Sequence, residues 1–221
     1  MDYKKLGFLN DNLRNMTEEY ISMIAIGSIA TGDPWMEGRS DRDILLVFNQ
    51  NPSQYSSRIK YIADSLLFNP TYIFTAIKKE EFTGPENSSH DFSHKFRSQI
   101  LFGADLIGET RLPERERIFE IYSRGIREVT EKLEKKLHYG KLWPVGKIRD
   151  VFWKQFKHAF MYLAIKHYYE TGYYPKTKQE VADILDSKEL QESLRVLHSI
   201  DQQPKEEIEE IAKGLLSYLR D

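Results

Sequence analysis

The stretch of sequence that decides the fold runs through residues 24–48 and reads IAIGSIATGDPWMEGRSDRDILLVF. It begins with a short apolar run that ends at Gly27 and Ser28. A spacer rich in turn-forming residues follows, and then Asp41 and Asp43 open a second apolar run. Both runs are short and rich in Ile, Leu and Val, which is typical of buried strands. We therefore expect two strands joined by a long turn.

Asp41 and Asp43 are two residues apart, so that on a strand their side chains project from the same face. Two neighbouring carboxylates repel each other unless a cation lies between them. Ligands that are all oxygen suit a hard cation, so the pair predicts a site for Mg²⁺ or Mn²⁺. The turn at Gly27 and Ser28 offers backbone N–H groups and a hydroxyl, which suit a phosphate. A metal site beside a phosphate site is what nucleotidyl transfer requires.

A pair of acids spaced in this way is weak evidence when it stands alone, because short motifs arise often by chance. The combination is more specific, since a strand, a Gly-Ser turn, a turn-rich spacer, the acidic pair and a second strand follow one another. The alternative that the pattern leaves open is a surface hairpin whose acidic end is solvated.

Two motifs in this stretch resemble the nucleotidyltransferase superfamily, which contains the palm of DNA polymerase beta and the kanamycin and streptomycin nucleotidyltransferases. Residues 27–32, GSIATG, are similar to the family's Gly-Ser-x-Ala-x-Gly motif, and residues 40–45, SDRDIL, to its Ser-Asp-x-Asp-hydrophobic-Leu motif. The spacer, which contains Pro34 and Trp35, is slightly longer than in the small members. The resemblance implies an α+β fold in which a small mixed β-sheet has flanking helices.

The same resemblance implies roles for these residues. Gly27 and Ser28 would bind the nucleotide, and Asp41 and Asp43 would be both the catalytic carboxylates and the metal ligands. The implied reaction is a metal-dependent attack of an acceptor hydroxyl on the α-phosphorus of a nucleoside triphosphate, with loss of pyrophosphate. ATP is the first candidate for the triphosphate. A small hydroxylated molecule of the aminoglycoside type is the first candidate for the acceptor, because the architecture is similar to the antibiotic-modifying members.

Residues 71–77, TYIFTAI, are β-branched and aromatic and predict a third strand. Related enzymes commonly carry a third carboxylate on the corresponding strand, but this strand contains no acid. Asn69 lies near the place where the streptomycin enzymes carry a glutamate. Glu80 and Glu81 follow the strand directly. The simpler interpretation of these two acids is that they lie in solvent where the chain leaves the strand. The candidates for the general base are Glu80, Glu81, Asp105 and His158.

The remaining segments of the first half are predicted from their periodicity. Residues 2–20 and 52–67 are expected to form amphipathic helices, and residues 92–101 a further helix. Residues 100–108, ILFGADLIG, resemble the stretch that closes the catalytic domain in the antibiotic-modifying members. Within this stretch, Asp105 is expected to be a turn or cap residue rather than a ligand.

From Pro113 onward the pattern is wholly helical, which predicts a catalytic domain at residues 1–110 and an all-α helical bundle at residues 111–221. The sequence around residues 171–177 resembles a junction in the C-terminal bundles of these enzymes, which are grouped as HEPN-like. Thr177 and Glu180 form the sequence signature of a capping box. The predicted helices are 114–138, 145–170, 188–198 and 204–220.

The helix predicted at residues 145–170 has two features that admit more than one interpretation. Lys154 and His158 lie one turn apart, so they could bind a triphosphate or an acceptor together, or belong to a solvated basic face. Aromatic residues gather at the end of the helix and beyond it, among them Tyr169 and Tyr174. They could form a stacking surface for a base, although the core of a helical bundle is the simpler interpretation.

The composition limits the other classes of function. The chain has 221 residues, a formal net charge of −2 and no cysteine, which excludes disulfides and Cys-ligated zinc. The balance of charges argues against a nucleic-acid-binding surface. No apolar run approaches membrane-spanning length, so no membrane partner is expected. The first residues contain no signal-peptide core, so we expect a cytoplasmic protein.

Two further functions stay open at this point. A chain that keeps Asp41 and Asp43 but lacks a third acid could bind a nucleotide and regulate a partner, with little or no turnover. It could also nucleotidylate a protein, as antitoxins of the superfamily do, although those are usually a lone catalytic domain with a separate HEPN partner. The expected partners are a nucleotide and a small-molecule hydroxyl acceptor, and a homodimer is compatible with the sequence.

Overall fold

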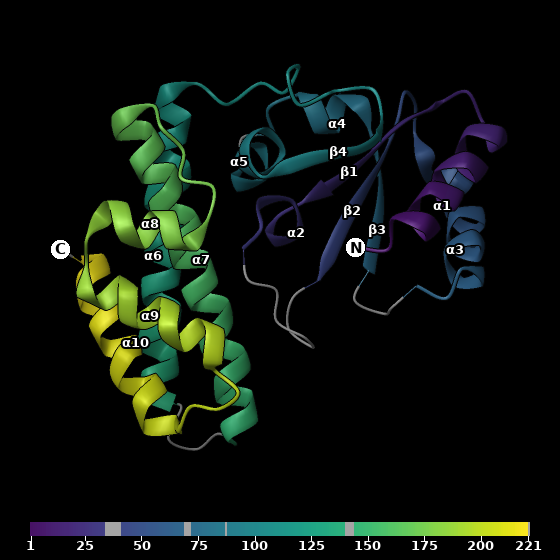
Figure 1. Ribbon diagram of the computed structural model, residues 1–221. Helices are drawn as coiled ribbons and strands as arrows, with labels where there is room; N and C mark the ends of the chain where they lie inside the picture. Colours follow the sequence, from purple (N-terminus) through teal and green to yellow (C-terminus); the bar gives the residue numbers. More distant parts are fainter. Residues whose placement is uncertain (34–40, 69–71, 87, 140–143, 221) are drawn as a thin grey trace. The chain divides into compact units, whose positions relative to one another are not determined.

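The protein consists of two compact units, Met1–Pro113 and Glu114–Asp221 (Figure 1). The first unit contains a β-sheet with helices packed on it, and the second contains helices (Figure 1). This arrangement confirms the predicted α+β fold class. The computed structural model describes residues 1–33, 41–68, 72–86, 88–139 and 144–220.

Four strands form one mixed sheet in the described part of the first unit, in the order β3-β2-β1-β4. The central strand β1 runs antiparallel to both β2 and β4, whereas β2 and β3 are parallel. The mixed sheet is the one that the sequence predicted, and the two apolar runs of residues 24–48 lie in its two central strands. The strands are β1 (Tyr20–Ile26), β2 (Arg42–Phe48), β3 (Tyr72–Lys78) and β4 (Ser98–Gly103).

The prediction of a helix at residues 92–101 is confirmed for residues 92–96 and is wrong for residues 98–101. The helix in this region, α5 (Ser89–Phe96), ends earlier, and the chain then forms the edge strand β4. These residues form a strand because they pair with β1. Ile100 lies opposite Ile24 of β1 and joins the apolar contacts of the sheet. Gly103 ends β4 with φ +96, and a Cβ there would lie 2.2 Å from the carbonyl oxygen of Ile21. Only glycine allows this close approach.

Each face of the sheet has its own apolar core, because side chains alternate along the strands. One face is covered by α1 and α3 (Figure 1), and the buried leucines of α1 (Leu6, Leu9 and Leu13) belong to its core. On the other face, Leu45 and Val47 pack with Phe82 of α4. The predicted helices at 2–20 and 52–67 are shorter in the structure. The bounds are α1 (Tyr3–Met16), α2 (Ser28–Thr31), η1 (Pro52–Tyr55), α3 (Ser56–Ser65) and α4 (Lys79–Thr83).

The second unit contains five helices within its described residues, as its helical periodicity predicted. The capping box is confirmed, because Thr177 Oγ1 accepts from the Glu180 N–H and the Glu180 carboxylate accepts from the Thr177 N–H. The first two helices pack closely where Gly125 faces the ring of Tyr162, since a Cβ at Gly125 would lie 2.2 Å from that ring. The helices are α6 (Arg115–Tyr139), α7 (Val145–Thr171), α8 (Lys178–Leu185), α9 (Lys188–Ser199) and α10 (Lys205–Arg220).

None of the helices in the described ranges combines the length and the apolar character that crossing a bilayer requires.

A buried histidine makes the first unit sensitive to acid. The ring of His94 stacks on Phe82 at a centroid distance of 4.8 Å, and its Nδ1 has no hydrogen-bond partner among the described atoms. Burial, assisted by the charge of His90, lowers the pKa of His94 to about 4, although Asp91 opposes the shift. The unfolded chain therefore binds a proton below about pH 6.5, whereas the folded chain does so only near pH 4.

We expect the free energy of unfolding to be fully retained above about pH 6.5 and to fall as the pH drops toward 4. The His94 contribution to the loss between pH 7 and pH 5 should be about 2 kcal/mol. Urea unfolding at the two pH values measures it, with His94→Gln as the comparison. If this variant loses as much stability as the wild type, His94 is not the source of the pH dependence.

Candidate active site

Gly27 and Ser28 lie where β1 ends and the one-turn helix α2 begins. Gly27 has φ +71, a conformation that residues with a Cβ rarely adopt, so the turn requires glycine here. Gly32 closes α2 in the left-handed region, and its N–H donates to the carbonyl of Ser28. The first N–H groups of a helix have no partner within the helix, so such a turn can offer them to a ligand. The local geometry is therefore compatible with the predicted phosphate site.

A buried ion pair holds this turn in place. The Gly27 N–H donates to the carbonyl oxygen of Arg97 at 2.8 Å, just before β4 begins. Nη2 of Arg97 in turn donates to Oδ2 of Asp33 at 2.7 Å, and the side chain of Asp33 is fully buried. Arg97 thus bonds to residues at both ends of α2, Gly27 through its backbone and Asp33 through its side chain. Sequence reasoning missed this pair, because nothing local links two residues that are 64 positions apart.

Asp43 lies on β2, directly after Arg42, and Asp41 precedes the strand. Asp43 shares its face of the sheet with Leu45 and Val47, which is the face that carries α4. Ala25 lies opposite Ile44, so the Gly27 turn and Asp43 are at the same end of the two central strands. Asp41 is exposed and Asp43 is half-buried. The predicted spacer, residues 34–40, lies outside the described residues.

The neighbour of Asp43 on β3 is Ile73. Paired residues of parallel strands point to the same side, so Ile73 flanks Asp43 on the same face. Its side chain is 41% exposed. The position next to Asp43 on the neighbouring strand therefore holds an apolar side chain. Among the described residues, no group of three or more His, Cys, Asp or Glu side chains is gathered as a metal site.

Two of the candidate bases have structural roles. The Glu81 carboxylate accepts the N–H of Lys78 at 2.9 Å and so caps α4. Asp105 accepts the N–H of Ile107 at 3.0 Å, which is the turn role that the sequence predicted. Glu80 is exposed on α4. Asn69 lies outside the described residues.

The remaining candidates lie in the second unit. Lys154 and His158 are both exposed on α7. Partial burial and then the charges of Lys157 and Lys132 lower the pKa of His158. The lysines around His158 are compatible with a solvated basic face.

The aromatic residues near the end of α7 pack mainly against their own unit. The ring of Tyr169 lies 5.8 Å from that of Phe119 and 5.5 Å from that of Tyr122, and the Arg115 guanidinium lies over it at 4.7 Å. Tyr174 is buried. These contacts favour the interpretation of the cluster as part of the helical core.

We expect the Arg97–Asp33 pair to be important for stability, because removing one partner takes the ion pair away from a charge that stays buried. Asp33→Asn and Arg97→Gln should each lower the free energy of unfolding by about 3–5 kcal/mol. The double variant should lose less than the sum of the two, since the partners interact. Urea unfolding of the three variants measures this.

The matched control is Glu128→Gln, which breaks the exposed ion pair between Glu128 and Lys132. Exposed pairs contribute about 0–1 kcal/mol. A loss at Asp33 that is no larger than the loss at Glu128 would show that the buried pair does not hold the turn.

The comparisons with known proteins concern the fold. No protein-family model matches the chain, and no curated protein matches it. Among solved structures, the chain is similar to the spectinomycin adenyltransferase AAD(9) from Enterococcus faecialis, which was crystallised with ATP and spectinomycin. The TM-score is 0.57 at 12% identity, and the similarity covers 99% of each chain. This chain therefore has the fold of a nucleotidyltransferase, as its Gly-Ser and Asp-x-Asp motifs predicted.

Proposed function

We propose that this protein transfers a nucleoside monophosphate from a nucleoside triphosphate to a hydroxyl group of a small-molecule acceptor. The observation that carries the proposal is that the Gly27 turn and Asp43 meet at one end of β1 and β2. Its support is the fold, shared over the full chain with an adenyltransferase solved with ATP and spectinomycin. ATP is accordingly the first candidate for the donor. An aminoglycoside-like compound is the first candidate for the acceptor.

The residues at this end of the sheet suit a triphosphate and a divalent cation. Gly27 would shape the turn, since its own N–H donates to the Arg97 carbonyl, and the N–H and hydroxyl of Ser28 would bind phosphate oxygens. Asp41 and Asp43 would hold Mg²⁺ or Mn²⁺ through carboxylate oxygens. When bound, the cation neutralises phosphate charge and orients the reacting groups. In this proposal residues 1–110 form the catalytic domain, and residues 111–221 form an attached helical domain.

The reaction forms a bond between the acceptor oxygen and the α-phosphorus and breaks the bond from that phosphorus to pyrophosphate. The acceptor loses its proton to a base. Among the described acids of the first unit that the sequence offered for this role, Glu81 and Asp105 already accept backbone N–H groups. Glu80, which is exposed at the start of α4, is the remaining choice there.

Ile73 favours a second candidate function. Among the described residues, this site offers the carboxylates of Asp41 and Asp43, and the neighbour of Asp43 on β3 is apolar. Such a site could bind a nucleotide with little turnover and act as a nucleotide-dependent regulator. Binding and transfer therefore need separate tests.

The first test concerns binding. A nucleoside triphosphate with Mg²⁺ should stabilise the folded protein by about 2.7 kcal/mol when the ligand concentration is about 100 Kd. Ser28→Ala should weaken this stabilisation. Asp41→Asn and Asp43→Asn should each abolish the part of it that depends on Mg²⁺. Thermal melts with and without the two ligands measure all three effects.

The control for these melts is Asp64→Asn, which removes an exposed carboxylate from α3 on the opposite face of the sheet. Its ligand response should equal that of the wild type. We also expect Asp41→Asn to leave the metal-free protein as stable as the wild type or slightly more stable, since it relieves repulsion. A clear loss of stability without any change in the ligand response would show that Asp41 is structural.

The second test concerns turnover. Ile73→Glu would place a third carboxylate beside Asp43, and we expect it to raise the Mg²⁺-dependent release of pyrophosphate if the wild type is limited by the missing acid. Ile73→Gln, which has the same shape without the charge, is the matched control. Mass spectrometry of a panel of hydroxylated acceptors identifies the product. If wild-type turnover is already fast and Ile73→Glu slows it, the two-carboxylate site is complete and the regulator hypothesis fails.

A further inference from the structure

The strand β3 forms an edge of the sheet. Within the described residues it pairs with β2 and with no other strand. An edge strand presents a row of backbone N–H and C=O groups that can pair with another strand. Proteins usually protect such an edge with charges or proline, but β3 reads YIFTAIK and carries its single charge at its last residue, Lys78. Ile73 within it is 41% exposed. This edge is therefore suited to pairing.

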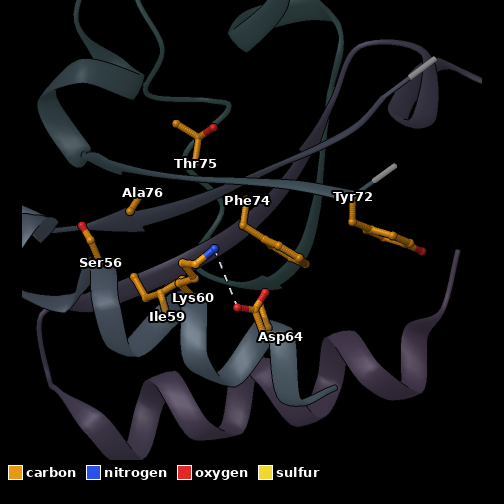
Figure 2. A pocket seen from close by; sticks show the side chains of 9 residues that line it. Ser56, Ile59, Lys60, Asp64, Tyr72, Phe74, Thr75 and Ala76 are labelled. Carbon is orange, nitrogen blue, oxygen red and sulfur yellow. Dashed lines mark ion pairs between the residues drawn. The ribbon is translucent and has the colours of Figure 1, made fainter. Parts of the chain in front are cut away.

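A groove runs beside this edge, between β3 and α3 (Figure 2). Its volume is about 490 Å³. Figure 2 shows that Phe74 and Tyr72 lie along the strand side of the groove, while Ala76 leaves space near Ser56 at its other end. On the helix side, Lys60 and Asp64 pair with each other at 3.8 Å. The groove thus has an end lined by the rings of Tyr72 and Phe74 and an end lined by the small side chain of Ala76.

We propose that this edge pairs with the same edge of a second copy of the chain, so that two β3 strands run antiparallel about a two-fold axis at Thr75. A two-fold interface requires a surface that is complementary to itself. The sequence of β3 meets this condition when Thr75 lies opposite Thr75 of the other copy. In that register Phe74 lies opposite Ala76, Ile73 opposite Ile77, and Tyr72 opposite Lys78.

Three of these four pairs favour the register. On the groove face, the large ring of Phe74 lies beside the small Ala76 of the other copy, so the aromatic end of one groove meets the Ala76 end of the other. Tyr72 on the same face is opposite Lys78, but its ring is buried and already lies against the Arg42 guanidinium at 5.0 Å, so this pair does not favour the register. On the other face, Ile73 meets Ile77 and Thr75 meets Thr75, and cross-strand pairs of both kinds stabilise sheets.

The arrangement joins the two sheets into one continuous sheet. It buries the exposed part of Ile73 and satisfies the backbone groups of both edges at the same time. A one-residue slip would place every side chain opposite a different partner and would lose the match between Phe74 and Ala76. The self-complementary register favours a second copy over an unrelated extended peptide as the occupant.

The first measurement is the mass of the wild-type chain in solution, by light scattering after size-exclusion chromatography over a range of micromolar concentrations. We expect a species of twice the chain mass of 26.1 kDa that dissociates on dilution. In the same concentration series, amide hydrogen exchange in β3 should slow as the dimer forms. A chain that stays monomeric, or a β3 whose exchange does not depend on concentration, overturns the proposal.

The second measurement uses Thr75, which lies opposite Thr75 of the other copy in the proposed register. Thr75→Lys and Thr75→Asp each place like charges opposite each other, so each should raise the dimer dissociation constant by about tenfold or more. An equimolar mixture of the two variants should restore the dimer, because the charges are then opposite. Gln99→Lys on β4, an exposed position on the other edge strand, is the control and should dimerise like the wild type.

These outcomes test the surface itself and need no nucleotide or acceptor. Circular dichroism and thermal melts confirm that the Thr75 variants are folded. If the wild type dimerises but both Thr75 variants do so equally well, the interface lies elsewhere and the proposal fails. It also fails if the mixed variants do not pair better than either variant alone.

Discussion

The antiparallel pairing of β1 with β2 is the constraint on which the first unit depends. Ala25 lies opposite Ile44, and this register brings the Gly27 turn and Asp43 to the same end of the sheet. It also decides which side chains are buried on each face, because a slip by one residue would exchange the two faces of a strand. Asp43 would then point toward the core under α1 and α3 instead of the face that carries α4.

The second constraint comes from β4, which reaches β1 from a distant part of the chain. The residue before β4 is Arg97, whose carbonyl accepts the Gly27 N–H and whose guanidinium pairs with the buried Asp33. A buried ion pair contributes little net free energy, yet it is costly to break, because either partner alone would be an uncompensated charge. Such a pair suits a turn that must keep one conformation while its N–H groups stay open to a ligand.

The candidate site combines strong and weak signals for catalysis. The fold, the glycine turn and the two aspartates agree with one another, and all three are expected of a nucleotidyltransferase. Ile73 does not fit this expectation, since the strand beside Asp43 carries an apolar side chain at this position and contains no acid. The same residue lies on the sheet edge that we propose as a dimer surface. The strand β3 is thus where this chain departs most from the pattern that its motifs resemble.

The sequence by itself determined the features that depend on neighbouring residues. The Gly-Ser turn, the Asp-x-Asp strand, the helical second unit and the cap made by Thr177 and Glu180 all arise from local spacing and propensity, so a pattern of a few residues was enough. The structure confirmed this fold class and these elements. The roles of Asp41 and Asp43 at the site remain predictions.

Only the tertiary structure decided the features that depend on distant residues. Residues 98–103 form a strand because β1 offers them an edge, although the sequence predicted a helix as far as residue 101. Arg97 and Asp33 meet only after β4 has docked, and Ile73 becomes the neighbour of Asp43 only through the register of β3 with β2. Pairing between strands joins positions many residues apart, and no local pattern encodes which of them will meet.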